Sequence, residues 1–261
     1  MNRNEVGIFG MGFVGMAMKK LFPSALFYDP KCANSSSIDD INNKCSVAMI
    51  CVPTPLKDDG LLDISIVEGV VKECECPLIV LRSTVNPGDC DRFEKKYNKN
   101  ILMVPEYIGE TIAHPLLDET KRGFLIIGGR PENRRKLIEL YTLVYNANIT
   151  IKQVSNYEAE VIKLSENRAI AFRVMSLHEL YLACEKAGVD YYTIRDAVYG
   201  DDPRFNLWFS FVYPNNLGFQ SSKCLSKDVP AWCAWAESVG INPEITKLLV
   251  KRSKDYSKIN K

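Results

Sequence analysis

The first half of the chain alternates short apolar runs with stretches in which apolar residues recur at helical spacing. The apolar runs rich in β-branched residues are Val6–Phe9, Leu26–Tyr28, Val47–Cys51, Leu78–Arg82, Leu102–Val104, Phe124–Ile127 and Ile149–Lys152. The helical patterns lie at Val14–Leu21, Ser65–Glu73, Gly88–Tyr97 and Glu132–Tyr145. Strands that alternate with helices form βαβ units, so we predict an α/β fold with a doubly wound, mostly parallel sheet that helices cover on both faces.

The pattern changes at Ser155 and becomes entirely helical. Ser155-Asn156-Tyr157-Glu158 matches the S-x-x-E capping box, and no helix breaker follows until Gly188. We predict one long connecting helix between these points, far above the average helix length of roughly 12 residues. Shorter helices are expected near Tyr191–Val198, Lys227–Ser238 and Pro243–Tyr256, with an aromatic-rich stretch at Phe205–Phe219. The sequence thus predicts an α/β domain over residues 1–154 and a helical domain, which includes the long helix, over residues 155–261.

The composition, 46% hydrophobic and 25% charged, is that of a globular protein and excludes a disordered chain. The net charge of +1 gives no field that would favour nucleic acid or an acidic membrane as a partner. No apolar run approaches the roughly 20 residues of a membrane span, and the first residues lead directly into a strand, so we expect no signal peptide. The nine cysteines are odd in number and irregularly spaced, which fits free thiols in a reducing compartment and predicts a cytoplasmic protein. We expect no metal site, because Cys74-Glu75-Cys76 has no second Cys or His pair at zinc-site spacing.

A glycine-rich loop directly follows the first predicted strand and opens the first predicted helix. It reads Gly10-Met11-Gly12-Phe13-Val14-Gly15 and fits the G-x-G-x-x-G pattern. In that pattern the first glycine permits a tight turn, the second lets the backbone approach a pyrophosphate, and the third lets helix and strand pack closely. The helix N-terminus then offers free N–H groups to the phosphates. The loop therefore predicts a dinucleotide site on a Rossmann-type domain.

An acidic residue at the end of the second strand narrows the choice of dinucleotide. Asp29 lies 19 residues beyond Gly10, at the position expected for the residue that binds the adenosine ribose. Its carboxylate would accept a hydrogen bond from the ribose hydroxyl and would repel a 2′-phosphate. We therefore expect NAD as the cofactor rather than NADP.

Seven further segments occur in an order that resembles the UDP-glucose/GDP-mannose dehydrogenase family of nucleotide-sugar 6-dehydrogenases. They are Cys51-Val52-Pro53-Thr54-Pro55, Ser83-Thr84-Val85-Asn86-Pro87-Gly88, Pro105-Glu106-Tyr107-Ile108-Gly109-Glu110, Ala159-Glu160-Val161-Ile162-Lys163, Asn167, Gly200-Asp201-Asp202-Pro203-Arg204 and Cys224-Leu225-Ser226-Lys227-Asp228. The resemblance covers nearly all of the chain. It implies that UDP-glucose, two NAD and water give UDP-glucuronate and two NADH, through a thioester on Cys224.

The position of Cys224 suits a nucleophile. It lies just before a predicted helix and close to Lys227, and both a helix N-terminus and a cation favour the thiolate over the thiol. A thiolate can add to an aldehyde, and loss of hydride from the adduct leaves a thioester. By its residue type and place alone, Cys224 is equally well explained as a small buried filler. The resemblance favours the nucleophile.

Lys163 and Asn167 are four residues apart on the long helix and so share one face of it. An ammonium and an amide donor side by side could stabilise an alkoxide or a tetrahedral oxyanion, although a lysine on a helix is also typical of a solvated face. The resemblance implies the catalytic role. It further implies that Asp228 orients Lys163 or the water and shares the general-base work.

The resemblance also assigns roles to residues outside the long helix. It implies that Glu110 takes part in hydrolysis of the thioester, that Thr84 holds the water and that Glu106 lies beside the substrate. Arg204 would reach a sugar bound to the neighbouring subunit, which implies a homodimer through the long helix and the helical domain, although an arginine there could also simply cap the turn at Asp202. The implied contacts with NAD add Pro53, Thr54, Thr84, Glu110 and Lys227 to the glycine loop, and the implied substrate contacts are Glu106, Glu110, Lys163, Asn167, Arg204 and Cys224.

The sequence departs from the family pattern in two places. The family has a glycine-rich loop before the cysteine, approximately P-G-x-G-Y-G-G-S-C. Here the run from Pro214 to Cys224 is two residues longer and keeps only Gly218 of those glycines, so the loop must differ in shape. The second Rossmann-like domain of the family, which binds much of the nucleotide half of the substrate, is absent from this sequence.

Two other functions remain open from the sequence. A two-electron dehydrogenase of the 3-hydroxyacid type also places a Lys and an Asn on a long helix but has no need of Cys224. A non-catalytic NAD-binding or partner subunit would account for the missing domain. The aromatic stretch Phe205–Phe219 is expected to supply core, a self-association surface, or both.

Overall fold

The structure of the protein is a computed structural model that describes residues 5–109 and 118–259. Its contacts divide the chain into two compact units. Unit 1 comprises the residues up to 108 together with residues 118–163, and unit 2 contains the chain from residue 164 onward. The division falls within the long helix, after Lys163.

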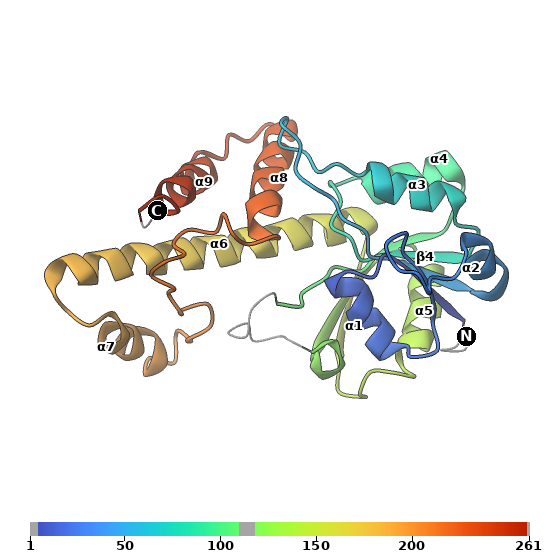
Figure 1. The fold of residues 1–261 in the computed structure, drawn as a ribbon, viewed down its shortest axis with the longest axis horizontal. Helices are drawn as coiled ribbons and strands as arrows, with labels where there is room; N and C mark the ends of the chain where they lie inside the picture. Colours follow the sequence, from blue (N-terminus) through green and yellow to red (C-terminus); the bar gives the residue numbers. More distant parts are fainter. Residues whose placement is uncertain (1–4, 110–117, 260–261) are drawn as a thin grey trace. The chain divides into compact units, whose positions relative to one another are not determined.

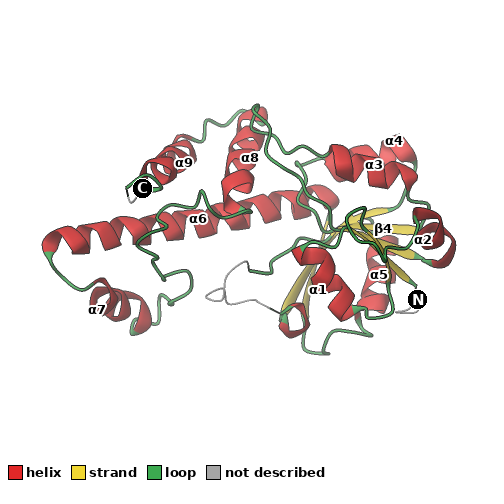
Figure 2. Cartoon of the chain, in the orientation of Figure 1, coloured by secondary structure: helices red, strands yellow, loops and turns green. Residues whose placement is uncertain are grey.

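Unit 1 is built on a parallel sheet. Among the described residues, five strands pair in the order β2-β1-β3-β4-β5, and all four pairings are parallel. These strands are β1 (Val6–Phe9), β2 (Leu26–Tyr28), β3 (Val47–Ile50), β4 (Leu78–Leu81) and β5 (Ile101–Met103), and a second parallel pair consists of β6 (Phe124–Gly128) and β7 (Thr150–Val154). The prediction of an α/β fold with a mostly parallel sheet is confirmed (Figure 2).

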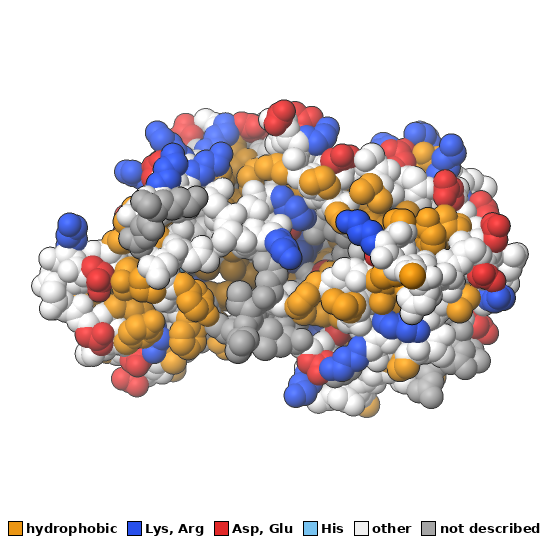
Figure 3. All heavy atoms as spheres, in the orientation of Figure 1, with side chains coloured by type: hydrophobic (Ala, Val, Ile, Leu, Met, Phe, Trp, Pro, Cys, Tyr) orange, Lys and Arg blue, Asp and Glu red, His pale blue; other side chains and the backbone are white. Residues whose placement is uncertain are grey.

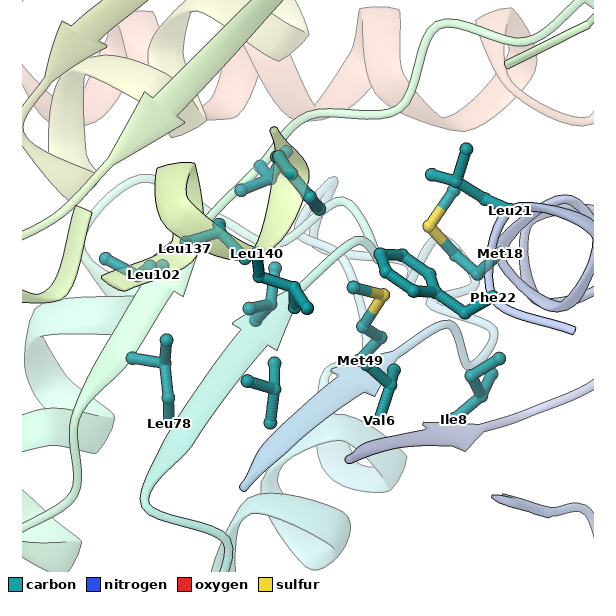
Figure 4. Close-up of a cluster of buried hydrophobic side chains, with 14 of the residues drawn as sticks. Val6, Ile8, Met18, Leu21, Phe22, Met49, Leu78, Leu102, Leu137 and Leu140 are labelled. Atoms are coloured by element: carbon teal, nitrogen blue, oxygen red, sulfur yellow. The ribbon is translucent and has the colours of Figure 1, made fainter. Parts of the chain in front are cut away.

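Helices cover both faces of this sheet (Figure 1). They are α1 (Phe13–Leu21), α2 (Ile38–Lys44), α3 (Ser65–Glu73), α4 (Asp89–Tyr97) and α5 (Pro131–Tyr141), with a short 3-10 turn at Glu119–Lys121. One buried cluster joins the sheet to these helices (Figure 4). It contains Ile8 of β1 and Met49 of β3, which pack with Phe22 after α1 and with Leu140 of α5. Burial on both faces explains why the strands are apolar at consecutive positions rather than alternately.

Two elements differ from the sequence prediction. The sequence pattern did not predict α2, a short helix in which Ile41 is the buried residue and Ser37 caps the first turn by accepting a hydrogen bond from the N–H of Asp40. One buried position in seven residues gives too weak a periodicity to be recognised. The helix predicted to reach Tyr145 ends at Tyr141, because the chain turns there to bring the Tyr145 side chain into the core.

The long helix α6 (Asn156–Ala187, 32 residues) begins where the capping box predicted. The N–H of Glu158 donates to Ser155 Oγ at 3.2 Å, and the N–H of Ser155 donates to Glu158 Oε2 at 2.7 Å. This reciprocal pair satisfies two backbone donors that a helix start otherwise leaves open. The length and start of the predicted helix are confirmed.

Unit 2 is helical, and the described part of it contains no strand. After α6 come α7 (Tyr191–Arg195), which continues into a π-helical turn at Asp196–Gly200, then α8 (Leu225–Ser238) and α9 (Glu244–Tyr256). Two small clusters form its core, one with Phe219 and Val229 and one with Tyr191 and Leu217. No helix within the described ranges is long and apolar enough to cross a membrane.

The capping box makes a stability prediction. Replacing Ser155 by alanine removes the side-chain acceptor for the Glu158 N–H, so Ser155→Ala should lower the free energy of unfolding by about 1 kcal/mol. Urea denaturation followed by circular dichroism measures this change. The matched control is Ser176→Ala on the same helix, where the exposed hydroxyl only donates back to the carbonyl of Arg173. Equal stability of the two variants would contradict the prediction.

Candidate active site

Each of the three glycines of the Gly10–Gly15 loop meets a different requirement of the G-x-G-x-x-G pattern: a tight turn, open space beside the backbone, or close packing. Gly10 has a φ of +88°, which only glycine adopts without strain. A Cβ on Gly15 would lie 1.9 Å from the carbonyl oxygen of Gly10, so no side chain fits where α1 passes the loop. A Cβ on Gly12, the N-cap of α1, would meet nothing within 4 Å. The N-terminus of α1 thus faces open space, where the pyrophosphate of a dinucleotide fits.

Asp29 is bonded to the glycine loop. Its Oδ2 accepts the N–H of Met11 at 2.7 Å, and its Oδ1 accepts the N–H of Lys31 at 2.9 Å. The N–H of Met11, and next that of Lys31, hold the pKa of the Asp29 carboxyl below its ordinary value. The residue is therefore an anion at neutral pH, half-buried at the end of β2, as a ribose-binding acid must be.

Other residues assigned to the cofactor lie at the carboxyl ends of neighbouring strands. Pro53 and Thr54 follow β3, and Thr84 follows β4; Pro53 is exposed, whereas both threonines are buried. Ser83 ties the two segments together, because its hydroxyl donates to the carbonyl of Val52 at 2.7 Å. Ligands of open parallel sheets bind outside this edge. Of the loop residues, Phe13 is more than half exposed and Val14 is half-buried.

Glu106 was expected beside the substrate, and the structure places its carboxylate in a buried ion pair. Glu106 Oε2 pairs with Nη2 of Arg82 at 2.5 Å, and Glu106 Oε1 accepts the N–H groups of Tyr107 and Ile108, each at 2.6 Å. Arg82 is fully buried directly after β4. Both carboxylate oxygens are thus engaged in fixing the Pro105–Gly109 segment.

Sequence reasoning missed the charged cluster to which this pair belongs. Nη2 of Arg82 also contacts Glu119 at 3.1 Å, and Glu119 Oε1 receives Nη1 of Arg122 at 2.9 Å and the Tyr145 hydroxyl at 2.6 Å. Burial opposes ionisation of Glu119, but the two arginines overcome it and hold the pKa of its carboxyl below the ordinary value. The residues of this cluster are scattered between positions 82 and 145, so no local pattern in the sequence indicates it.

Lys163 lies on α6, buried, with its Nζ 5.0 Å from the centroid of the Tyr107 ring. The preceding turns of α6 are hydrogen-bonded into unit 1. Asn156 accepts the N–H of Met103 and donates to the carbonyl of Ile101, both in β5. Glu160 Oε2 accepts the N–H of Gly88 at 2.5 Å, and its Oε1 accepts that of Cys90 at 2.8 Å, at the N-terminus of α4. These contacts fix the part of α6 that carries Lys163.

In unit 2, Cys224 lies just before α8, as the sequence predicted; the helix begins two residues earlier than expected, at Leu225, so that Cys224 is its N-cap and is half-buried. The Asp228 carboxylate, fully buried, receives Nδ2 of Asn167 at 2.6 Å and Nζ of Lys227 at 2.6 Å. The N–H groups of Lys227 and Asp228 donate to the carbonyl of Cys224. The structure therefore brings Asn167, Lys227 and Asp228 together around the first turn that follows the cysteine.

Two further candidates stand apart from these groups. The Arg204 guanidinium pairs with Asp202, at 2.6 Å between Nη2 and Oδ2, and its side chain is 80% exposed. In the single chain Arg204 therefore caps the turn at Asp202, which is one of the two roles that the sequence left open. Glu110 lies outside the described residues. The described residues also contain no group of three or more metal-ligating side chains placed to hold an ion.

The loop before Cys224 is anchored at its remaining glycine. Gly218 has a φ of +82°, and a Cβ there would lie 2.4 Å from the carbonyl oxygen of Ser253 in α9. Its N–H donates to Nδ1 of His178, and the N–H of Phe219 donates to Ser253 Oγ. Burial lowers the pKa of His178 to about 4, so the ring stays neutral and keeps this acceptor. A pocket of about 250 Å³ lies against the loop, lined by Asn215, Asn216, Leu217, Gln220, Ser221, Tyr256 and Ser257.

Glu160 makes stability depend on pH. Burial raises the pKa of its carboxyl from 4.5 to about 7, so the folded state binds more protons than the unfolded state between these values. The contribution of Glu160 is then greatest below pH 4.5 and is lost as the pH rises to 7. The free energy of unfolding of the wild type, measured relative to Glu160→Gln, should fall by about 3 kcal/mol between pH 4.5 and pH 8. Urea denaturation across this range tests it, and a difference that does not change with pH would refute it.

Two domain models of one known family match most of the chain. Residues 27–146 match the NAD binding domain of the UDP-glucose/GDP-mannose dehydrogenase family, and residues 157–254 match its central domain. A UDP-glucose 6-dehydrogenase of Rickettsia bellii is 26% identical over 252 residues, which are 91% of this chain and 56% of that protein. An uncharacterized protein of Methanocaldococcus jannaschii is 30% identical over 220 residues, 78% of this chain and 23% of its own length. The chain thus spans about half, or less, of these curated relatives.

Solved structures show the same fold. A UDP-glucose dehydrogenase from Pyrobaculum islandicum superposes with a TM-score of 0.81 at 22% identity, over 96% of this chain and 68% of that one. A UDP-D-ManNAc dehydrogenase from Pyrococcus horikoshii gives a TM-score of 0.79 at 18% identity, with the same coverage. From the glycine loop, the two domain matches and this fold, the chain belongs to the UDP-glucose/GDP-mannose dehydrogenase family and carries its NAD-binding and central domains.

Proposed function

We propose that the chain oxidises UDP-glucose to UDP-glucuronate with NAD, in two hydride transfers that pass through a thioester on Cys224. The observation that carries this proposal is the group around the start of α8. There the Asp228 carboxylate binds Asn167 and Lys227 one turn after the cysteine. Acyl chemistry at a cysteine needs such groups beside the thiol: a buried acid, an amide and a cation. UDP-glucose dehydrogenases among the relatives support the choice of sugar.

The roles of the residues follow from their chemistry. NAD, when bound, supplies the hydride acceptor for each of the two oxidations. In the first, the sugar 6-hydroxyl loses a proton and its carbon loses a hydride, which leaves an aldehyde. The Cys224 thiolate then adds to that carbonyl carbon, and a second hydride loss from the adduct leaves the thioester. Attack by water releases the acid and returns the thiol. Lys163 and Asn167, one turn apart on α6, would stabilise the negative oxygen in these steps.

Stoichiometry tests the two hydride transfers. With UDP-glucose and excess NAD, the chain should form two NADH for each sugar consumed, as measured by absorbance and by chromatography of the sugar nucleotide. Cys224→Ser should abolish formation of the acid, because an alcohol is a far weaker nucleophile than a thiolate.

The matched control is Cys233→Ala in the same helix α8. Burial raises the pKa of the Cys233 thiol to about 11, so it stays protonated and should be dispensable. Wild-type rates of acid formation by Cys224→Ser would remove the cysteine from the mechanism. If UDP-glucose is not oxidised, GDP-mannose and UDP-D-ManNAc are the next substrates, since dehydrogenases of both are among the structural relatives.

A second candidate is a non-catalytic NAD-binding partner subunit. The observation that favours it is the glycine loop with Asp29 bonded to it, which suits NAD whether or not the groups around Cys224 act. This function predicts NAD binding with no NADH formed from any nucleotide sugar. A two-electron dehydrogenase would instead form one NADH for each substrate molecule and would keep its activity in Cys224→Ser.

We further propose that the chain forms a homodimer through an aromatic face of unit 2. This face consists of Tyr192, Phe205, Leu207, Trp208, Phe211 and Tyr213, which are each between 40% and 60% exposed. Figure 3 shows apolar side chains gathered over the region that carries α7. Soluble monomers rarely leave so many large apolar side chains together in water.

The nine cysteines are all free thiols, which supports the expected reducing, cytoplasmic compartment.

Light scattering tests the homodimer. The wild type should have the mass of a dimer at micromolar concentration, and Trp208→Glu should shift it to the monomer, because a carboxylate at a buried interface loses its water. The control is Ile245→Glu on α9, an exposed apolar residue outside the aromatic face, which should leave the dimer intact. A monomeric wild type would contradict the proposal.

A further inference from the structure

The Lys163 ammonium has a specific neighbour in unit 1, the face of the Tyr107 ring. Nζ lies 5.0 Å from the ring centroid, within the distance at which a cation is attracted to an aromatic face. Lys163 is 5% exposed, so water competes little for the ammonium. Cation–π attraction is strongest where the charge is desolvated. The contact is therefore worth more here than at the surface.

The backbone that carries the Tyr107 ring is fixed by hydrogen bonds to Glu106. Glu106 accepts the N–H groups of Tyr107 and Ile108 and is itself paired with Arg82, which is fully buried. Oxygen acceptors on two successive N–H groups fix the backbone that carries the ring. Because Arg82 follows β4, which has a paired strand on each side, its ion pair with Glu106 ties the segment to the interior of the sheet.

The ring itself is packed between other groups. The Phe124 ring meets it edge-on, at 5.1 Å between centroids, and the Arg122 guanidinium carbon lies 4.7 Å from its centroid. Arg122 is held in turn by Glu119 and by the carbonyl of Pro105. The exposed fraction of the Tyr107 side chain is correspondingly small. The ring therefore has little freedom to follow a moving lysine.

The backbone of Lys163 is fixed independently. Glu160, one turn earlier on α6, receives two N–H groups from the start of α4. With the helix fixed at one end and the ring fixed at the other, the remaining freedom of Lys163 is that of its side-chain torsions. The Tyr107 ring face attracts the ammonium and so favours the torsions that place Nζ over the ring.

We propose that Tyr107 is a positioning residue, whose ring face holds the Lys163 ammonium in the place from which it stabilises the reacting oxygen. This inference rests on the proposed function for the role of Lys163 and goes beyond it in assigning Tyr107. The ring, rather than the hydroxyl, is the acting group. Glu106 and Arg82 act one step further back, by holding the ring.

Kinetics test the proposal through two substitutions of the same residue. Tyr107→Leu should lower kcat about tenfold with little change in KM for NAD, because a misplaced ammonium affects the transition state and not the glycine loop. Tyr107→Phe keeps the ring face and should retain wild-type kcat. The matched control is Tyr97→Leu, which removes a half-buried ring 5.2 Å from the ammonium of the exposed Lys96 and should leave kcat unchanged. Equal kcat for the Leu and Phe variants at Tyr107 would overturn the assignment.

A second measurement needs no catalysis and so separates this inference from the proposed function. In chain labelled with ¹³C at the lysine ε-carbons, the resonance of Lys163, identified by its loss in Lys163→Arg, should be shifted upfield by the ring current of Tyr107. The shift should persist in Tyr107→Phe and vanish in Tyr107→Leu. An unshifted Lys163 resonance in the wild type would overturn the contact itself. A shifted resonance in a chain that oxidises no nucleotide sugar would retain the contact and reject only the proposed function.

Discussion

The position of Lys163 in unit 1 depends on how the first turns of α6 are bonded into that unit. Asn156 completes the edge of β5, and Glu160 supplies both oxygens to the open N–H groups at the start of α4. The start of a helix needs such a fixed point, since the internal hydrogen bonds of a helix do not attach it to its neighbours. Lys163, one turn after Glu160, takes its place within unit 1 from these bonds.

Several buried charges among the described residues are paired with groups of the same unit. Arg82 and Arg122 meet Glu106 and Glu119 within unit 1, and in unit 2 the buried Asp228 is bound by Lys227 and by the Asn167 amide. Removing one member of a buried pair leaves an uncompensated charge and typically costs about 3–5 kcal/mol. These groups therefore combine two requirements. They keep ionised side chains in the interior, and they hold the backbone segments beside which substrate and cofactor are proposed to bind.

The features that sequence reasoning predicted are those governed by neighbours along the chain. Each of these features is set by a few consecutive residues: the glycine loop, Asp29 after β2, the capping box at Ser155 and the place of Cys224 just before a helix. The features it missed join distant segments. The ion pair between Glu106 and Arg82 was missed because the two residues are 24 positions apart and an arginine gives no sign of burial. The helix α2 was missed because its single buried residue leaves no periodicity.

The loop before Cys224 has a consequence for where this polypeptide can be divided. Its one glycine sits against the Ser253 carbonyl, and the hydroxyl of the same serine accepts the next N–H, so the last helix is part of the support of the loop. The helix α9 therefore supports the loop that leads to the Cys224 thiol. Any boundary chosen for expression, splitting or fusion has to leave α9 whole, because a cut that removes its final turns would release the loop that leads to Cys224.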